Sequence, residues 1–165
     1  LAAARQAGKC KFIGVSNYPP KLLEEMADDP AITVMPAVNQ LELHPRFSSP
    51  ALRRYAADTG MVLTGYGSGN STRIGASPVV AGIAERLSVS PLAVVLKWTV
   101  CRDVGCIPRT ATPGHMEENL KVLTDNSAVP LSEEDLSALD QLNQAHCYYW
   151  SPLPCLPVDQ RQPDM

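Results

Sequence analysis

The sequence has few aromatic residues, no excess of basic charge and no long apolar run. Its aromatic residues are two Phe, two Trp and five Tyr, and its net charge is -3. Because the chain has no excess of positive charge, nucleic acid is not an expected partner. No apolar stretch approaches the roughly 18–20 residues that span a bilayer, so no membrane partner is expected.

Metal-ligand and disulfide patterns are also missing. The five cysteines show no Cys-x-x-Cys spacing, and the three histidines are scattered. We therefore expect no metal site and no disulfide framework, but reduced thiols in a cytoplasmic protein. The first residue is Leu1, and LAAARQAGK is typical of the end of a helix, so we expect the polypeptide to extend upstream.

Short apolar segments alternate four times with amphipathic helical segments. The predicted strands are residues 11–15, 37–40, 61–66 and 104–108. Predicted helices cover 22–29, 48–57, 78–87 and 91–102, and two more begin at Thr112 and Ser132. The segment 91–102 is apolar around most of its circumference, which predicts deep burial. Residues 67–75 show no helical period and predict a loop, and the segment after Asn143 predicts an aperiodic tail, laid over a surface or disordered.

Four βα units make either half of an eight-stranded barrel or most of a small doubly wound sheet. The GxGxxG fingerprint of the doubly wound dinucleotide fold is missing. Polar residues recur at every predicted strand end, whereas a doubly wound sheet concentrates them at one switch point. We therefore predict an α/β fold that is a partial TIM (β/α)8 barrel with a C-terminal helix and tail. The expected domain covers residues 1–150, and a proline-rich tail covers 151–165.

The polar strand ends are the candidate site, because ligands bind beyond the carboxyl ends of parallel strands. They are Ser16-Asn17, Asn39-Gln40, Tyr66 and Pro108-Arg109-Thr110. The hydroxyl and amide groups of the first two ends suit a planar amide such as a nicotinamide carboxamide. Their alternative role is to close their own strand-end turns.

The later candidates suit the other parts of a dinucleotide. Tyr66 could stack on an aromatic ring or be a core tyrosine. Arg109 and Thr110 precede a helix start and suit a phosphate, although Arg109 could also be only solvated. Glu118 and Asn119 could bond an adenine edge or lie on an exposed helix face. His44 is most simply structural, and no histidine stands out as a base beside a carboxylate.

Several segments, in order, resemble the aldo-keto reductases. They are GKCKFIGVSNY, AVNQLELHP, the strand that ends at Tyr66, SPLAVVLKW, CIPRTATPGHMEENL and LSEEDLSALDQLN. The resemblance runs from Leu1 to about Trp150 and is to the C-terminal half of such an enzyme, with barrel strands five to eight.

The resemblance implies an NADPH site at the same strand ends. It implies that the nicotinamide carboxamide is held by Ser16, Asn17 and Gln40, and that Tyr66 stacks on the ring. It places Ser71 near the pyrophosphate and Arg109 and Thr110 on the 2′-phosphate. It also places Glu118 and Asn119 on the adenine.

The chain departs from the family pattern in four places. Arg109 replaces the usual lysine, and both side chains bind phosphate. His115 replaces an arginine, which predicts a weaker or pH-dependent contact. The loop GSGNS replaces SPLGS. No position matches the family's catalytic Asp, Tyr, Lys and His, so we predict little activity from this chain alone.

Two functions follow as hypotheses. The first is that the parent protein reduces aldehydes or ketones to alcohols with NADPH, this chain supplying the cofactor-binding half. The substrate would then be a small carbonyl compound. The alternative is a non-catalytic half-barrel that binds nucleotide or acts as a scaffold. Its open strand edges would favour self-association.

Overall fold

Four short parallel strands form the centre of the structure, a computed structural model that describes residues 1–68, 71–145 and 147–148. The strands are β1 (Gly14–Ser16), β2 (Val38–Glu42), β3 (Val62–Tyr66) and β4 (Gly105–Cys106). They lie side by side in the order of the sequence, and every pairing is parallel. The predicted α/β class is therefore confirmed.

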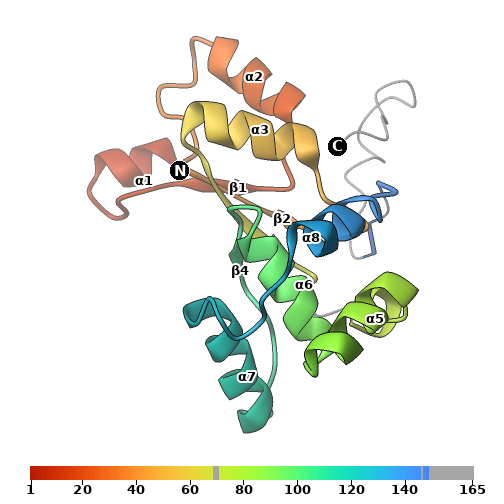
Figure 1. The fold of residues 1–165 in the computed structure, drawn as a ribbon. Coiled ribbons are helices and arrows are strands. Elements are labelled where there is room, and N and C mark those ends of the chain that lie inside the picture. The colour runs from red at the N-terminus through yellow and green to blue at the C-terminus, as the bar shows by residue number, and fades with distance from the viewer. Residues whose placement is uncertain (69–70, 146, 149–165) are drawn as a thin grey trace.

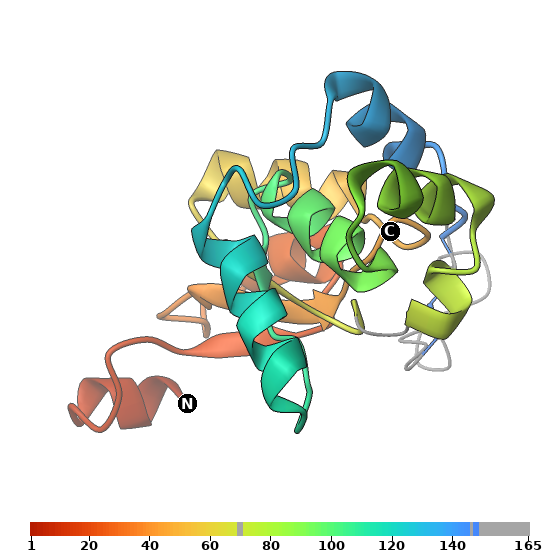
Figure 2. The ribbon, with the colours of Figure 1, turned by 60° about the horizontal axis from the view of Figure 1, so that its bottom comes forward.

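Helices follow each strand along one side of this sheet (Figures 1 and 2). They are α2 (Pro20–Asp28), α3 (Pro50–Thr59), α4 (Ser71–Ile74), α5 (Pro78–Leu87), α6 (Pro91–Val100), α7 (Pro113–Thr124) and α8 (Glu133–Asp140), whereas α1 (Ala2–Gln6) precedes β1. A doubly wound sheet reverses its strand order at a switch point. No reversal occurs in this sheet, so the arrangement is that of an opened barrel, as predicted.

The strand register divides the sheet into a covered and an uncovered face. Successive side chains of a strand point to opposite faces. On the covered face Asn39, Leu41 and Leu63 are buried. On the uncovered face Ser16 and Gln40 are exposed, and Val62 is 57 % exposed. The second group faces what would be the interior of a closed barrel.

Helix α6 is the most deeply packed helix among the described residues. All residues from Ala93 to Thr99 are buried. Trp98 is completely buried and lies in the main core with Leu63 and Leu139. The predicted burial of this apolar helix is confirmed.

Helix caps follow the sequence in one case and depart from it in another. Ser132 and Asp135 form a complete capping box at the start of α8, with Asp135 in the place of the usual Glu or Gln. Ser49 is the N-cap of α3, but its side chain makes no cap hydrogen bond because its backbone lies in the left-handed region (φ 44°). The helix predicted over 48–57 therefore begins at Pro50 without a side-chain cap from Ser49.

The edge strands are shorter than their apolar patterns predicted. Pairing of β1 begins at Gly14, and Phe12, inside the predicted strand, is 69 % exposed. Strand β4 is limited to Gly105 and Cys106, since Pro108 has no N–H to continue a ladder. Both strands pair on one side only among the described residues, so fewer hydrogen bonds hold them in extended form.

The predicted loop at 67–75 contains one helical turn, α4 (Ser71–Ile74). Ile74 is completely buried, which holds this turn against the core despite the polar composition around it. The predicted tail at 151–165 lies outside the described residues.

Within the described ranges, no single helix is long and apolar enough to cross a membrane. Helices α5 and α6 together satisfy the length and composition, but they are bent by 98° at the break between them.

Candidate functional site

The carboxyl ends of β1 and β2 are joined by hydrogen bonds from the first predicted pair. The register places Ser16 beside Gln40. The Ser16 hydroxyl donates to the Gln40 carbonyl (2.8 Å), and the Asn17 backbone N–H donates to the same oxygen (2.9 Å). Ser16 therefore closes the strand end as well as lying at the candidate site.

Asn17 connects three strand ends. Its backbone has a positive φ of 59°, a conformation that Asn tolerates better than most residues. Its side-chain N–H donates to the Ser16 hydroxyl (3.2 Å), and its Oδ1 accepts from the Tyr66 hydroxyl (3.1 Å). The Glu42 N–H also points at this oxygen (3.4 Å). The predicted neighbourhood of Ser16, Asn17 and Tyr66 is thus present.

The Asn39-Gln40 pair divides between the two faces of the sheet. Asn39 is completely buried and bonds the backbone of Tyr18, donating to its carbonyl (2.7 Å) and accepting from its N–H (3.4 Å). Asn39 therefore closes the β1–α2 connection, the alternative role considered from sequence. Gln40 is exposed on the uncovered face, so its amide is accessible to a ligand.

Tyr66 is partly buried at the end of β3, opposite Glu42. Burial raises the pKa of its phenol, and nearby Glu42 raises it further, whereas the hydrogen bond to Asn17 acts in the opposite direction. The phenol stays protonated at neutral pH and remains a donor to Asn17. The ring is thereby held at the strand ends beside Asn17.

Arg109 and Thr110 follow β4 at the same end of the sheet. The Ile107 N–H donates to the Gly65 carbonyl (3.2 Å), so the chain still runs beside β3 one residue before Tyr66. Arg109 is exposed, and Thr110 accepts a hydrogen bond from the Thr112 N–H (3.1 Å) just before α7. A fixed turn therefore presents Arg109 near the start of a 12-residue helix.

The remaining predicted contacts lie on α4 and α7. Ser71 is the first residue of α4. On α7, Glu118 is partly exposed and Asn119 is only 5 % exposed. Asn119 is therefore not on an exposed helix face, which was the alternative considered for it. Leu120, in contrast, is 62 % exposed.

A buried acid–histidine pair was missed by the sequence prediction. Glu42 and His44 are at most 1 % exposed, and the Glu42 Oε1 lies 3.0 Å from the His44 Nε2. The sequence analysis singled out no histidine beside a carboxylate and so did not anticipate this contact. Residues two apart on a strand share a face, and that spacing in ELH could have indicated the pair.

The segment after α8 covers this pair. The Tyr148 N–H donates to Glu42 Oε1 (2.5 Å), and the Tyr148 ring lies 5.2 Å from the His44 ring. Arg46 donates to the Tyr148 hydroxyl (2.9 Å) and to the Gln144 side chain (2.7 Å). Gln144 and Tyr148 are thus fixed at the end of β2, which agrees with the predicted alternative of a tail laid over a surface.

Comparisons with known proteins agree with the resemblance seen in the sequence. The sequence model of the aldo/keto reductase family matches residues 1–74. The chain is 36 % identical over 143 residues to D-galacturonate reductase of Hypocrea jecorina, covering 85 % of this chain and 43 % of that protein. It is 30 % identical over 141 residues to glycerol 2-dehydrogenase (NADP(+)) of Saccharomyces cerevisiae, covering 84 % of this chain and 43 % of that protein.

A solved structure, the apo form of Gox0644, is similar in fold. Its TM-score is 0.75 at 32 % identity, and the match covers 86 % of this chain and 50 % of the solved one. The chain thus spans about half the length of the relatives it matches. On the shared motifs, the shared fold and these matches, the chain belongs to the aldo/keto reductase family.

Proposed function

We propose that this chain is the cofactor-binding half of an NADPH-dependent reductase that converts aldehydes or ketones to alcohols. The observation that carries the proposal is the convergence of Gln40, Tyr66 and Arg109 at the carboxyl ends of neighbouring strands. The chemistry of these groups fits the cofactor, because an amide, an aromatic ring and a guanidinium suit its carboxamide, ring and phosphate.

The nicotinamide end would lie against β1, β2 and β3. The exposed Gln40 amide is available to pair with the carboxamide, and Ser16 and Asn17 complete that end. Tyr66, oriented by its hydrogen bond to Asn17 (3.1 Å), would present its ring to one face of the nicotinamide. NADPH supplies the reducing equivalent, and these residues set the orientation in which it is delivered.

The adenosine end would lie at the start of α7. Arg109 would bind the 2′-phosphate together with Thr110 and the free N–H groups of the helix start. Glu118 and Asn119 would contact the adenine, and Ser71 the pyrophosphate. His115 lies in the first turn of α7, in the place of the family's usual arginine, and would weaken this contact.

No residue of this chain matches the proton donor of the family. Reduction of a carbonyl needs a proton at the forming alkoxide, and general acid catalysis typically contributes about 10²–10⁴-fold. The buried Glu42–His44 pair does not fill this role, since both side chains are enclosed by the chain. The proposal therefore assigns binding and orientation to this chain and proton donation to groups it does not carry.

Tyr66→Ala is expected to weaken NADPH binding several-fold, because an aromatic stacking contact contributes about 0.5–1.5 kcal/mol beyond area burial. Tyr66→Phe keeps the ring and loses only the hydroxyl that donates to Asn17, so it should bind nearly as well. The change in NADPH fluorescence on titration measures the NADPH affinity of both variants. Equal losses in the two variants would show that the ring does not contact the cofactor.

A second candidate is the non-catalytic half-barrel. The exposed Val62 and Phe12 on and beside the uncovered face favour it, because two such faces could bury each other. Size-exclusion chromatography with NADPH titration separates the candidates. A dimer that binds NADPH but reduces no aldehyde favours the scaffold, whereas a monomer with reductase activity excludes it.

A further inference from the structure

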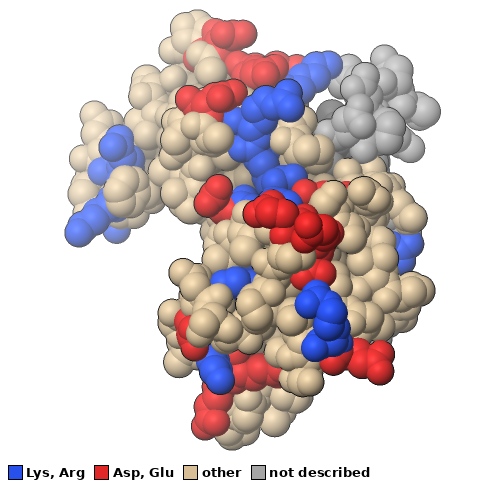
Figure 3. Space-filling model, in the orientation of Figure 1, with Lys and Arg blue, Asp and Glu red and all other residues tan. Residues whose placement is uncertain are grey.

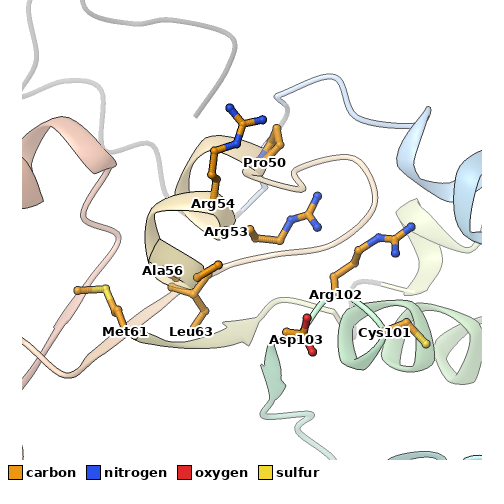
Figure 4. Close-up of a pocket in the computed structure, with 10 residues that line it drawn as sticks. Pro50, Arg53, Arg54, Ala56, Met61, Leu63, Cys101, Arg102 and Asp103 are labelled. Carbon is orange, nitrogen blue, oxygen red and sulfur yellow. The ribbon is translucent and has the colours of Figure 1, made fainter. Parts of the chain in front are cut away.

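A hollow of about 510 Å³ lies between α3, the start of β3 and the α6–β4 turn (Figure 4). Met61 precedes β3 and Asp103 precedes β4, so the hollow is at the amino ends of the strands. The candidate cofactor residues follow the carboxyl ends of the same strands. The hollow is therefore a separate place in the molecule.

Three arginines gather at this hollow. Arg53 and Arg54 come from α3, and Arg102 comes from the turn after α6. Figure 4 shows the Arg53 and Arg102 side chains extending the same way, whereas Arg54 points away from them. In Figure 3 basic side chains form a strip over the α3 region, with acidic ones beside it.

Hydrogen bonds fix the guanidinium groups of Arg53 and Arg102 and leave some of their N–H donors unpaired. Arg53 Nε donates to the Ser48 carbonyl (2.9 Å), and Arg102 donates from Nε and Nη2 to Asp140 (3.1 and 2.6 Å). Each guanidinium has five N–H donors. Each of these hydrogen bonds uses one N–H group. Among the described residues, four N–H donors of Arg53 and three of Arg102 therefore have no partner.

Burial and mutual repulsion make an anion favourable here. Burial lowers the pKa of the Arg53 guanidinium, and neighbouring Arg102 lowers it further, against the opposite effects of Asp140 and Asp103. Asp103 and Asp140 balance the charges of Arg53 and Arg102, and Arg54, which points away from them, adds one positive charge at the edge of the hollow. Asp140 also accepts from the Trp98 indole (3.0 Å), so its lone pairs are largely used.

Apart from the arginines, Cys101 and Asp103, the lining is apolar. Leu63 and Ala56 are buried residues of β3 and α3, and Met61 lies beside them. A volume of this order accommodates a small organic molecule. We propose that this hollow binds a small monocarboxylate, its carboxylate held by Arg53 and Arg102 and its apolar body against Met61 and Leu63.

The probe for this proposal is hexanoate, titrated into the full chain by isothermal calorimetry. Acetate lacks the apolar body, hexan-1-ol lacks the charge, and inorganic phosphate has a different charge. Hexanoate should bind at least about tenfold more tightly than any of the three. Equal binding of hexan-1-ol or of phosphate would overturn the proposal, since it would remove the requirement for a carboxylate on an apolar body.

Arg53→Gln should weaken hexanoate binding by roughly tenfold or more, as expected for loss of a charged hydrogen bond. Arg54→Gln is the matched control, because it removes the same charge one residue away on α3. It should change binding less than twofold. Equal losses in both variants would indicate nonspecific attraction to the surface and would contradict the site.

Cys101 offers a readout that needs no variant. Cys101 is an exposed residue that lines the hollow, whereas Cys10 lies in a different hollow beside α1. Hexanoate should slow alkylation of Cys101 by N-ethylmaleimide, measured by mass spectrometry, and leave Cys10 unchanged. Unaltered alkylation of Cys101 at saturating hexanoate would refute the proposal. NADPH should not alter hexanoate affinity, so this test is independent of the proposed function.

Discussion

Arg109→Ala is expected to weaken NADPH binding by about 1.5–3 kcal/mol, the range for hydrogen bonds to charged groups, and to leave NADH binding nearly unchanged. The reason is that NADPH and NADH differ only in the 2′-phosphate. Arg109 is exposed beside the start of α7, where helix N–H groups also favour an anion. Fluorescence titration with each cofactor measures the two affinities.

Two control variants make the Arg109 experiment specific. Arg109→Lys restores the residue common in the family and should recover most of the NADPH affinity, because lysine also binds phosphate. Lys121→Ala removes one positive charge from the last turn of the same helix and should affect neither cofactor. Equal losses of NADPH and NADH affinity in Arg109→Ala would show that Arg109 does not contact the 2′-phosphate.

Trp98→Ala is expected to lower the free energy of unfolding by about 3–5 kcal/mol, the usual cost of removing a buried aromatic side chain. Trp98 is completely buried in the main core. Its indole N–H also donates to Asp140 (3.0 Å), so the substitution adds the loss of a hydrogen bond to a charged group. Urea denaturation followed by far-UV circular dichroism measures the change.

Trp98→Phe separates the packing contribution from the hydrogen bond. It keeps an aromatic ring in the core, and Asp140 retains its bidentate contact with Arg102. A loss of about 1–2 kcal/mol is expected, well below that of alanine. If the two variants were equally destabilised, the indole N–H rather than the volume of the ring would dominate at this position.

The helices were predicted more accurately than the strands, for a physical reason. The proline and serine signals before α5, α6, α7 and α8 act within a few residues, so they are present in the sequence itself. Strand length depends on partners distant in the chain. Phe12 has the residue type of a strand but lies outside β1, where no pairing partner extends that far.

The candidate site was predicted in outline because parallel strands align their carboxyl ends. Ser16, Gln40 and Tyr66 could be placed together from the order of the strands alone. The order of the strands could not show whether each side chain faces the ligand side or the covered face of the sheet. Asn39 and Gln40 are adjacent in sequence, yet one bonds Tyr18 in the interior and the other is exposed.

The sequence by itself determined the alternation of strands and helices, the helix starts and the family, since these depend on local residue types and on motif order. Only the tertiary structure decided the Glu42–His44–Tyr148 cluster and the arginine-lined hollow. Tyr148 reaches Glu42 across 106 residues, and Arg53 and Arg102 come from separate helical units. Contacts of that kind arise from packing, which no local pattern encodes.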